Sequence, residues 1–362
     1  MKKLFYSLLA LAVVAICGIF GWSWLKDNKF PNFQKSSEIY VRPGDSLMDV
    51  VDMIDDKCGI KDRKGLERTL AAKQVAEYMK PGHYYVGHSN SSVYVARMLN
   101  NGWQSPVKLT LAGNLRIKDN IAAKIASQTM MDEAEVRAAF DNDTLLARFG
   151  FTPATVFSLL VPDTYDIYWT ATMSEIFEKQ KEALDAFWTE ENDAKAKALG
   201  MTRQQVSTLA SIVKGETNYE PEMPLVAGVY LNRLALDMPL QADPTVAYCF
   251  DYTLNRVLNR HLEVDSPYNT YKHTGLPPGP ICVPTRACLQ AVLDADYGAG
   301  AGPGKGKPGK GGNLYFCANA DFSGTHAFAR TLSQHNANAA AFQRELNRRA
   351  AEKRKQQNNG TN

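Results

Sequence analysis

An uncharged apolar run near the amino terminus constrains this chain more than any other feature. The 22 residues from Leu4 to Leu25 carry no charge, and at about 1.5 Å of rise per residue such a helix crosses the roughly 30 Å hydrocarbon core of a bilayer. Residues 1–3 include two lysines, and Trp22 and Trp24 lie near the other end. This arrangement favours a transmembrane helix with a cytoplasmic tip at residues 1–3 and the body outside the cytoplasm.

Two other export signals compete with a membrane anchor. A cleaved signal peptide usually has a shorter apolar core that ends in small residues. A lipoprotein signal needs a small residue before its cysteine, whereas bulky Ile16 precedes Cys17 here. A retained anchor at residues 4–25 is therefore the prediction, and each alternative would still export the body.

Composition and charge narrow the class of protein. With 362 residues, 45% of them hydrophobic and 22% charged, the chain is long enough for about two globular domains. Its 41 basic and 38 acidic residues give a net charge of +3, which does not indicate a nucleic-acid partner. The cysteines outside the apolar run form no CxxC pair, and no HExxH motif occurs. We therefore expect no metal site and no other cofactor.

Two strand-then-helix units follow the apolar run. In the first, a strand-like stretch precedes Ser46 and Asp49, which have the spacing of a helix capping box. In the second, Tyr84–Asn101, a Tyr/Val-rich strand leads into a helix that Gly102 ends. We expect the two units to form one small α/β module at residues 38–115.

The rest of the chain divides by composition into further segments. The predicted segments are a tether at 26–37, a helical connecting region at 116–200, an α+β domain at 201–350 with a flexible Gly/Lys loop at 298–312, and a disordered tail at 351–362. The loop is predicted to be flexible because Gly, Lys and Pro offer too little apolar surface to order it. The predicted fold class is α+β with a single N-terminal transmembrane helix.

The helix-like segment Leu209–Thr217 carries a carboxylate on its apolar side. On a helical wheel Glu216 lies within about 20° of Leu209. Burying an ionised carboxylate is costly, so Glu216 should either pair with a cation or have a raised pKa. A protonated carboxyl group in a cleft suits a general acid, whereas an ion pair at the helix end would explain the same pattern without any function.

The next helix also turns a polar group inward. In the segment Pro224–Met238, Asn232 lies within about 20° of Leu225 on the wheel, and a buried amide needs partners. Inward polar groups on consecutive helices indicate a lined cleft, although a hydrogen bond between Glu216 and Asn232 would satisfy both. Runs of amide, hydroxyl and phenol groups follow in QADPTVAY, SPYNTY and GLPPGPI. Such groups bind sugar polymers.

Together these runs resemble the MltG (YceG-like) family of endolytic murein transglycosylases. The runs that carry the resemblance are PDTY, ASIVKGET, VAGVYLNRL, MPLQADPTVAY, SPYNTY, GLPPGPI and LYFCA, in this order. They cover most of residues 150–345, and the N-terminal half resembles that family's LysM-like region. The resemblance implies a single-pass enzyme of the bacterial inner membrane that cuts the MurNAc–GlcNAc β-1,4 bond within peptidoglycan strands and leaves 1,6-anhydroMurNAc ends. It also implies a role in terminating nascent strands, with peptidoglycan synthases of the elongation machinery as partners.

The family's catalytic glutamate falls on Glu216. Where relatives commonly carry another Glu two positions earlier, this chain has Lys214, which the wheel places about 140° from Leu209 and hence outward. We expect Glu216 to protonate the departing glycosidic oxygen and then to take the proton of the muramyl 6-hydroxyl. The residues expected to position substrate or to support the acid are Asn232, Gln241, Asp243, Thr245, Tyr248, Tyr268 and Asn269.

Two other functions remain open from the sequence. A lysozyme-like muramidase would need a second carboxylate beside Glu216, for which Asp243, Glu220 and Glu222 are the candidates. A non-catalytic peptidoglycan-binding scaffold would keep the cleft and need no acid. Asp243 also precedes Pro244, where an Asp commonly caps a turn.

Overall fold

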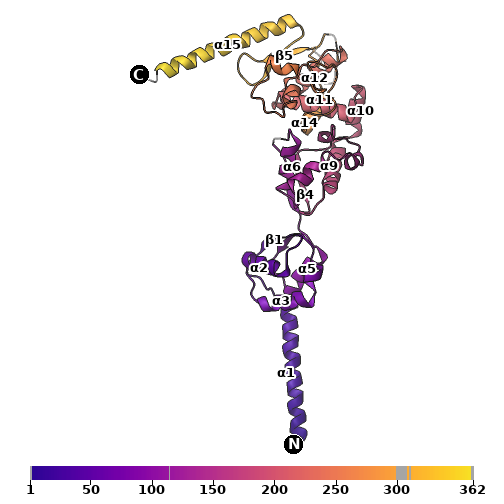
Figure 1. The fold of residues 1–362 in the computed structure, drawn as a ribbon, viewed down its shortest axis with the longest axis vertical. Helices are drawn as coiled ribbons and strands as arrows, with labels where there is room; N and C mark the ends of the chain where they lie inside the picture. The colour runs from indigo at the N-terminus through magenta and orange to yellow at the C-terminus, as the bar shows by residue number, and fades with distance from the viewer. Residues whose placement is uncertain (1, 114, 299–307, 310, 360–362) are drawn as a thin grey trace. The chain divides into compact units, whose positions relative to one another are not determined.

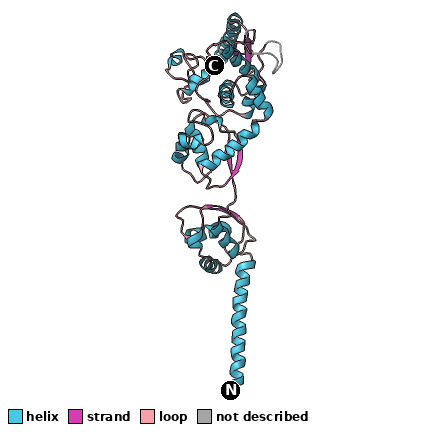
Figure 2. Ribbon diagram, turned by 90° about the vertical axis from the view of Figure 1, so that its right-hand side faces the viewer, coloured by secondary structure: helices cyan, strands magenta, loops and turns pink. Residues whose placement is uncertain are grey.

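A computed structural model describes residues 2–113, 115–298, 308–309 and 311–359. The chain forms two compact units (Figure 1). Unit 1 comprises Met1–Leu109, Ile125–Asp132 and Tyr165–Thr172, and unit 2 comprises Thr110–Lys124, Glu133–Thr164 and Met173–Asn362. Helices predominate and the strands are short (Figure 2). The predicted combination of helices and strands behind an apolar N-terminal helix is confirmed.

Unit 1 is built around a two-stranded antiparallel sheet covered by helices. Its elements up to residue 101 are α1 (Lys2–Lys29), β1 (Ser37–Val41), α2 (Leu47–Cys58), α3 (Arg63–Ala72), α4 (Val75–Tyr78), β2 (Gly82–Val86) and α5 (Ser92–Asn101). Strand β1 pairs with β2 so that Ser37 lies opposite Val86 and Val41 opposite Gly82. Buried Ile39, Val41 and Tyr84 from the strands pack with apolar side chains of the helices in one core.

Local signals in the sequence account for the ends of the helices in this module. Ser46 and Asp49 form the predicted capping box at the start of α2. The side chain of Ser91 caps α5 at the Tyr94 amide, and Gly102 ends that helix in a left-handed conformation. Both predicted strand-then-helix units are therefore present.

Helix α1 is long and apolar enough to cross a membrane. Its segment Tyr6–Lys29 has a mean hydropathy of 2.2 and is not buried by the rest of the protein. Because the helix continues to Lys29, it extends four residues beyond the predicted span. A retained anchor and a signal sequence both have these properties.

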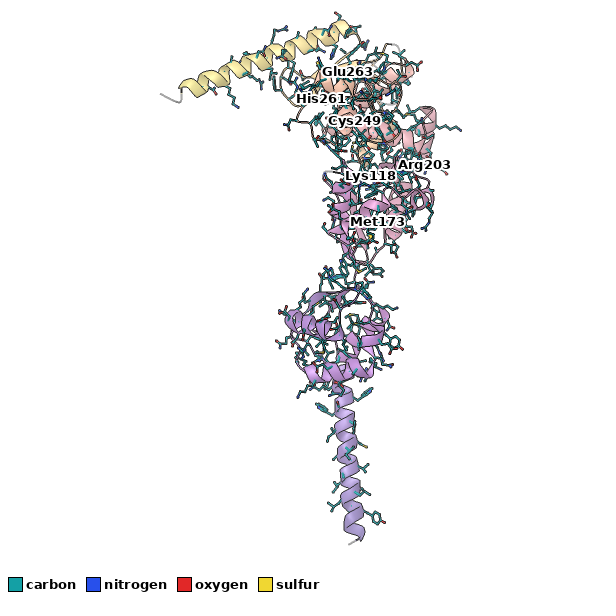
Figure 3. The ribbon with its side chains drawn as sticks, in the orientation of Figure 1. Lys118, Met173, Arg203, Cys249, His261 and Glu263 are labelled. Atoms are coloured by element: carbon teal, nitrogen blue, oxygen red, sulfur yellow. The ribbon has the colours of Figure 1, made fainter. Side chains whose placement is uncertain are left out.

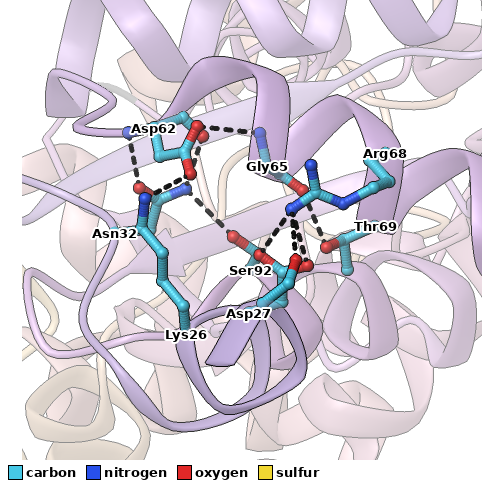
Figure 4. A network of polar contacts seen from close by, with 9 residues as sticks. Lys26, Asp27, Asn32, Asp62, Gly65, Arg68, Thr69 and Ser92 are labelled. Carbon is cyan, nitrogen blue, oxygen red and sulfur yellow. Dashed lines mark hydrogen bonds and ion pairs between the residues drawn. The ribbon is translucent and has the colours of Figure 1, made fainter. Parts of the chain in front are cut away.

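The segment predicted as a tether, residues 26–37, is instead ordered against the module (Figure 4). Lys26 forms an ion pair with Asp62 at 2.6 Å. The Asn32 amide donates to the Ser92 hydroxyl at 2.9 Å and to the Asp62 carbonyl at 3.1 Å, and its side-chain oxygen accepts from the Asp62 amide at 2.7 Å. Phe33 is fully buried in the core. Polar composition suggested a linker, but these side chains find specific partners.

A helical stretch leads from the module to the second half of unit 2. Its elements are β3 (Val107–Leu111), α6 (Lys118–Ala126), α7 (Glu133–Ala139), α8 (Asp143–Ala147), the 3₁₀ turn η1 (Val156–Ser158), β4 (Asp163–Ile167), α9 (Met173–Phe187) and α10 (Glu190–Ala198). Strands β3 and β4 pair in a second two-stranded sheet. Lys118, Met173 and Arg203, labelled in Figure 3, are the first residues of α6, α9 and α11.

The second half of unit 2 packs α11 against neighbouring helices and adds a short hairpin, β5–β6. Its elements are α11 (Arg203–Glu216), η2 (Glu220–Glu222), α12 (Met223–Ala235), α13 (Asp243–Tyr248), η3 (Asn259–Glu263), α14 (Arg286–Leu293), β5 (Tyr315–Ala318), β6 (His326–Ala329) and α15 (Leu332–Asn359). Helix α11 contacts α12, α13 and α14, and the β5–β6 hairpin contacts α15. Strand β5 pairs with β6 so that Phe316 lies opposite Phe328.

Two segments near the carboxyl terminus were predicted to be flexible or disordered. The tail predicted at 351–362 is helical as far as Asn359, because α15 continues through it. Its Ala, Glu, Lys, Arg and Gln residues all have high helix propensity, which outweighed its polar composition. Most of the predicted Gly/Lys loop, residues 299–307 and 310, lies outside the described residues.

Candidate active site

A cavity of about 340 Å³ opens in the second half of unit 2, within the size range of small-ligand pockets. It is lined by ionisable, amide and aromatic side chains from four helices, one hairpin and their connections. The lining residues are Glu216, Tyr230, Arg233, Leu240, Gln241, Asp243, Tyr271, Tyr315, Phe316, Leu332 and His335. A pocket with convergent polar groups on an aromatic frame suits a polar ligand with flat faces, such as a sugar.

Glu216 is the last residue of α11. A capping box between Thr202 and Gln205 starts this helix, and the extended backbone of Thr217 ends it. The preceding residue, Gly215, lies so close to α13 that a Cβ atom there would come within 2.6 Å of the Pro244 Cβ. Since only glycine permits this approach, Gly215 brings the α13 segment next to the acid.

The surroundings of Glu216 favour its protonated form near neutral pH. Burial raises the pKa of Glu216 from 4.5 to about 7, because a desolvated carboxylate is costly. The hydrogen bond from the Tyr230 hydroxyl, at 2.6 Å to Oε1, lowers this pKa, the negative charge of Asp243 raises it, and His326 lowers it. A carboxyl group with a pKa near neutrality can both donate and accept a proton.

Helix α12 supplies Tyr230 and Arg233 to the cavity wall. The Arg233 Nε donates to the Leu314 carbonyl at 2.7 Å, and its Nη1 donates to the carbonyls of Pro239 and Leu240, each at 3.0 Å. Its guanidinium also lies over the Tyr315 ring, 5.2 Å from the centroid. A single arginine therefore joins the helix to the loop before α13 and to the β5 hairpin.

Asp243 and Gln241 reach the cavity from the start of α13 and the loop before it. The Tyr271 hydroxyl donates to Oδ1 of Asp243 at 2.5 Å. Gln241 accepts from Arg233 at 3.2 Å and has a left-handed backbone, with φ of 53°. Such strain in a non-glycine residue needs support, which the bond from the Gln241 amide to the Thr270 carbonyl provides.

The remaining wall is aromatic. The Phe316 ring packs edge-on against Tyr230, with centroids 5.9 Å apart. The His335 ring of α15 stacks on Tyr315 at 5.5 Å, and its buried Nδ1 has no hydrogen-bond partner within the described residues. This wall gives a sugar ring apolar faces to pack on.

The YceG-like family model matches residues 39–341. The chain belongs to the YceG-like family. The resemblance seen in the sequence motifs is thereby confirmed.

Individual proteins that are similar to this chain have names consistent with the family. The chain is 28% identical over 313 residues to an endolytic murein transglycosylase of Bacillus subtilis, covering 82% of each protein. It is 25% identical over 368 residues to an endolytic murein transglycosylase of Streptococcus pneumoniae D39, covering 92% of this chain but 64% of that relative's length. A YceG-like protein of Listeria monocytogenes with a solved crystal structure has a TM-score of 0.53 and 26% identity, covering 84% of this chain and 98% of that one.

Three of the site residues expected from the sequence of this YceG-like chain line the cavity: Glu216, Gln241 and Asp243. Asn232 does not. It is fully buried behind the cavity wall and donates to the carbonyls of Asn313 and Tyr297, while its oxygen accepts from the Gly309 amide. Asn232 therefore joins α12 to both sides of the Gly/Lys segment rather than to a ligand.

Four other expected residues also lie outside the cavity lining. The hydroxyls of Thr245 and Thr270 are 2.9 Å apart in the interior. The Asn269 amide donates to the carbonyls of Leu262 and Val264. The rings of Tyr248 and Tyr268 pack on each other with centroids 4.7 Å apart. Figure 3 labels Cys249, which directly follows α13, and His261 and Glu263 of η3.

Lys214 and the other carboxylates near the acid have separate partners. Lys214 donates to the Asn218 side chain at 2.6 Å and is not among the groups that shift the pKa of Glu216, as its outward wheel position predicts. Glu220 is exposed, and Glu222 is buried with His326 rather than in the cavity lining. Of the three second carboxylates considered for a hydrolase, only Asp243 shares the cavity with Glu216.

No sequence pattern identified Tyr230, Arg233, Tyr271 or the hairpin residues as part of the site. Helix α12 is buried around most of its circumference, from Val226 to Arg233, so a single apolar stripe does not identify which side faces the cavity. One signal was available: the wheel places Tyr230 and Arg233 about 60° apart. Two large polar residues on one side of a mostly apolar helix indicate a functional face.

Proposed function

We propose that this chain is an endolytic murein transglycosylase that cuts the MurNAc–GlcNAc β-1,4 bond within peptidoglycan strands. The observation that carries the proposal is a cavity-lining carboxyl group, Glu216, with a pKa of about 7. Curated relatives that bear the name endolytic murein transglycosylase support it. A non-catalytic peptidoglycan-binding scaffold would not need a carboxyl group that titrates near neutral pH. The presence of Glu216 in the cavity therefore favours an enzyme.

In the proposed reaction one carboxyl group serves twice. Protonated Glu216 gives its proton to the glycosidic oxygen as the bond to the muramyl anomeric carbon breaks. The resulting carboxylate removes the proton of the muramyl 6-hydroxyl as that oxygen bonds to the same carbon, which forms the 1,6-anhydro ring. Glu216 ends protonated, and no water is consumed. An intramolecular hydroxyl has a large effective concentration advantage over water.

The cavity residues have distinct proposed roles. Asp243 keeps the acid protonated through its negative charge and holds Tyr271 in place. Gln241 and the rings of Tyr315 and Phe316 contact the sugars, because amides bind hydroxyl and acetamido groups and aromatic rings pack against sugar faces. Asn232, Thr245, Tyr248, Tyr268 and Asn269 act on this site only indirectly, by shaping the walls behind it.

The other parts of the chain serve the same substrate in this proposal. Helix α1 anchors the protein in the bacterial inner membrane as a single span, with the body outside the cytoplasm, in agreement with its mean hydropathy of 2.2. The module at residues 38–115 is a LysM-like unit that contacts glycan. Release of a growing strand would bring the enzyme close to the peptidoglycan synthases of the elongation machinery. No nucleic acid takes part.

A lysozyme-like muramidase is the second candidate, favoured by one observation. Asp243 lines the same cavity as Glu216 and could activate water or trap a glycosyl intermediate. Its Oδ1 is engaged by the Tyr271 hydroxyl at 2.5 Å, a contact that would restrict it in either role. The reaction product distinguishes the two candidates.

Digestion of purified peptidoglycan in ¹⁸O-water tests the proposal. The expected fragments are about 18 Da lighter than hydrolysis products, resist borohydride at the new end and carry no label, since no water enters. Glu216→Gln should reduce the rate at least about 10²-fold while the protein stays folded. Label at the anomeric carbon would instead establish the muramidase. Near-normal turnover by folded Glu216→Gln would remove Glu216 from the mechanism.

A further inference from the structure

A buried carboxylate–imidazole pair fastens the β5–β6 hairpin to the start of α12. Glu222 ends the η2 turn directly before α12, and its side chain is 6% exposed. Its Oε1 accepts the backbone amide of His326 at 2.6 Å, and its Oε2 lies 2.7 Å from Nδ1 of the same residue. One carboxylate thus binds both the backbone and the ring of the first residue of β6.

The pair is connected to the acid through two aromatic rings. The His326 ring packs edge-on against Phe316, with centroids 5.2 Å apart. Phe316 in turn packs edge-on against Tyr230 at 5.9 Å, and the Tyr230 hydroxyl bonds Glu216. The other strand of the same hairpin, β5, carries Tyr315 and Phe316 into the cavity wall. Displacing His326 would therefore disturb the wall nearest the acid.

We propose that Glu222 and His326 are a positioning pair for Glu216: they hold the β5–β6 hairpin against α12 and fix the place of the His326 imidazole relative to the acid. This inference rests on the proposed role of Glu216. Oε2 of Glu222 lies where Nδ1–H of His326 can donate to it, which fixes the orientation of the ring. A positive imidazolium stabilises the ionised form of Glu216, which is the form that must act as a base in the second half of the reaction.

The charged and titratable groups around Glu216 act in opposite directions. From α13, Asp243 favours the protonated acid, as does burial, whereas Tyr230 of α12 and His326 of β6 favour the carboxylate. The cavity lining also includes Arg233, Tyr271, Tyr315 and His335. On α11 itself, Lys214 is engaged by Asn218. Among these groups His326 is the one that a buried carboxylate, Glu222, holds through both its backbone amide and its ring.

The pH dependence of turnover by the full-length protein in detergent tests the pair. Rates on purified glycan strands are compared from about pH 5 to about pH 9 for wild type, His326→Gln, His326→Asn and Glu222→Gln. Each substitution removes the His326 imidazole or the carboxylate that holds it in place. The alkaline limb of the profile, where Glu216 loses its proton, should move up by about half to one pH unit. His273→Gln makes the same chemical change at an exposed position and should leave the profile unmoved.

A second measurement follows the acid without relying on turnover. The ¹³C NMR signal of the Glu216 carboxyl group, assigned by its loss in Glu216→Gln, should titrate at higher pH in the His326 variants. The variants could instead stay folded and turn over more slowly while neither the alkaline limb of the rate profile nor the NMR titration of Glu216 moves. That result would overturn the inference and mean that the pair has a structural role alone. An inactive wild type, or an active Glu216→Gln, would instead contradict the proposed function.

Discussion

The hydroxyl of Tyr230 donates a hydrogen bond of 2.6 Å to Oε1 of Glu216. Tyr230 is 2% exposed, and burial raises its pKa well above 10, so the phenol remains a donor at every pH the enzyme meets. Within the described residues Oε2 of Glu216 has no such partner. Because Oε1 is held, Oε2 is the oxygen free to face a glycosidic bond.

Tyr230→Phe should therefore change both the rate and its pH dependence. The bond stabilises the carboxylate, so its removal raises the pKa of Glu216 and moves the alkaline limb of the rate profile upward. Loss of orientation should lower kcat by about 10-fold. Tyr252→Phe is the matched control, because its hydroxyl bonds the Ile281 carbonyl away from the cavity. An identical profile in the two variants would argue against the role of Tyr230.

Glu216→Gln should stabilise the protein at alkaline pH and not at acidic pH. The pKa of Glu216 is about 7 in the folded state against 4.5 ordinarily, so above pH 4.5 the unfolded chain binds fewer protons than the folded one. Stability is therefore lost progressively between pH 4.5 and about pH 7. The neutral glutamine avoids this loss. Thermal unfolding should give a Tm a few degrees above wild type at about pH 8, and an equal Tm at about pH 4.

Features of the fold and of the candidate site could be predicted where their signal lies within a few residues of the sequence. The capping box of Ser46 and Asp49 and the stop at Gly102 are encoded within a few residues, and all appear as predicted. Glu216 was also identifiable, because an acidic residue on an apolar helical stripe is locally anomalous. The docking of Asn32 on the module was not, since its side-chain partners Asp62 and Ser92 lie 30 and 60 residues away along the chain.

The rest of the site required contacts that no pattern contains. In the sequence, Gly215 does not differ from any other glycine in a helix. Its role depends on the close contact with Pro244, which only the structure shows. Asn232 was correctly predicted to face inward, but burial alone does not tell a ligand-binding amide from one that bonds backbone carbonyls. His326 and Glu222 are 104 residues apart, and their pairing depends on how the β5–β6 hairpin packs. Long-range pairing of polar groups is decided by tertiary structure.

Asn232→Ala should lower the stability of the protein, whereas Gln241→Ala should weaken substrate binding. Asn232 bonds Asn313, Tyr297 and Gly309 in the interior, so its loss leaves buried groups unpaired at a cost of about 1–3 kcal/mol. Thermal unfolding should show a lower Tm with little change in KM. Gln241 lines the cavity, so its alanine variant should raise KM with a nearly unchanged Tm. A raised KM at normal Tm for Asn232→Ala would return Asn232 to the substrate-binding residues.

Asn32→Ala tests whether α1 is joined to the module by a structured connection. The Asn32 side chain bonds the Ser92 hydroxyl and both the amide and the carbonyl of Asp62, so its removal should cost about 1–3 kcal/mol. Full-length protein in detergent should show faster hydrogen exchange at the Asp62 amide and faster proteolysis near residue 32, because the freed segment opens locally. Asn28→Ala is the matched control: its amide bonds the Trp24 carbonyl one turn earlier in α1, so neither rate should change. Equal exchange and proteolysis in the two variants would mean that the connection behaves as the flexible tether its composition suggested, and that the module moves freely relative to α1.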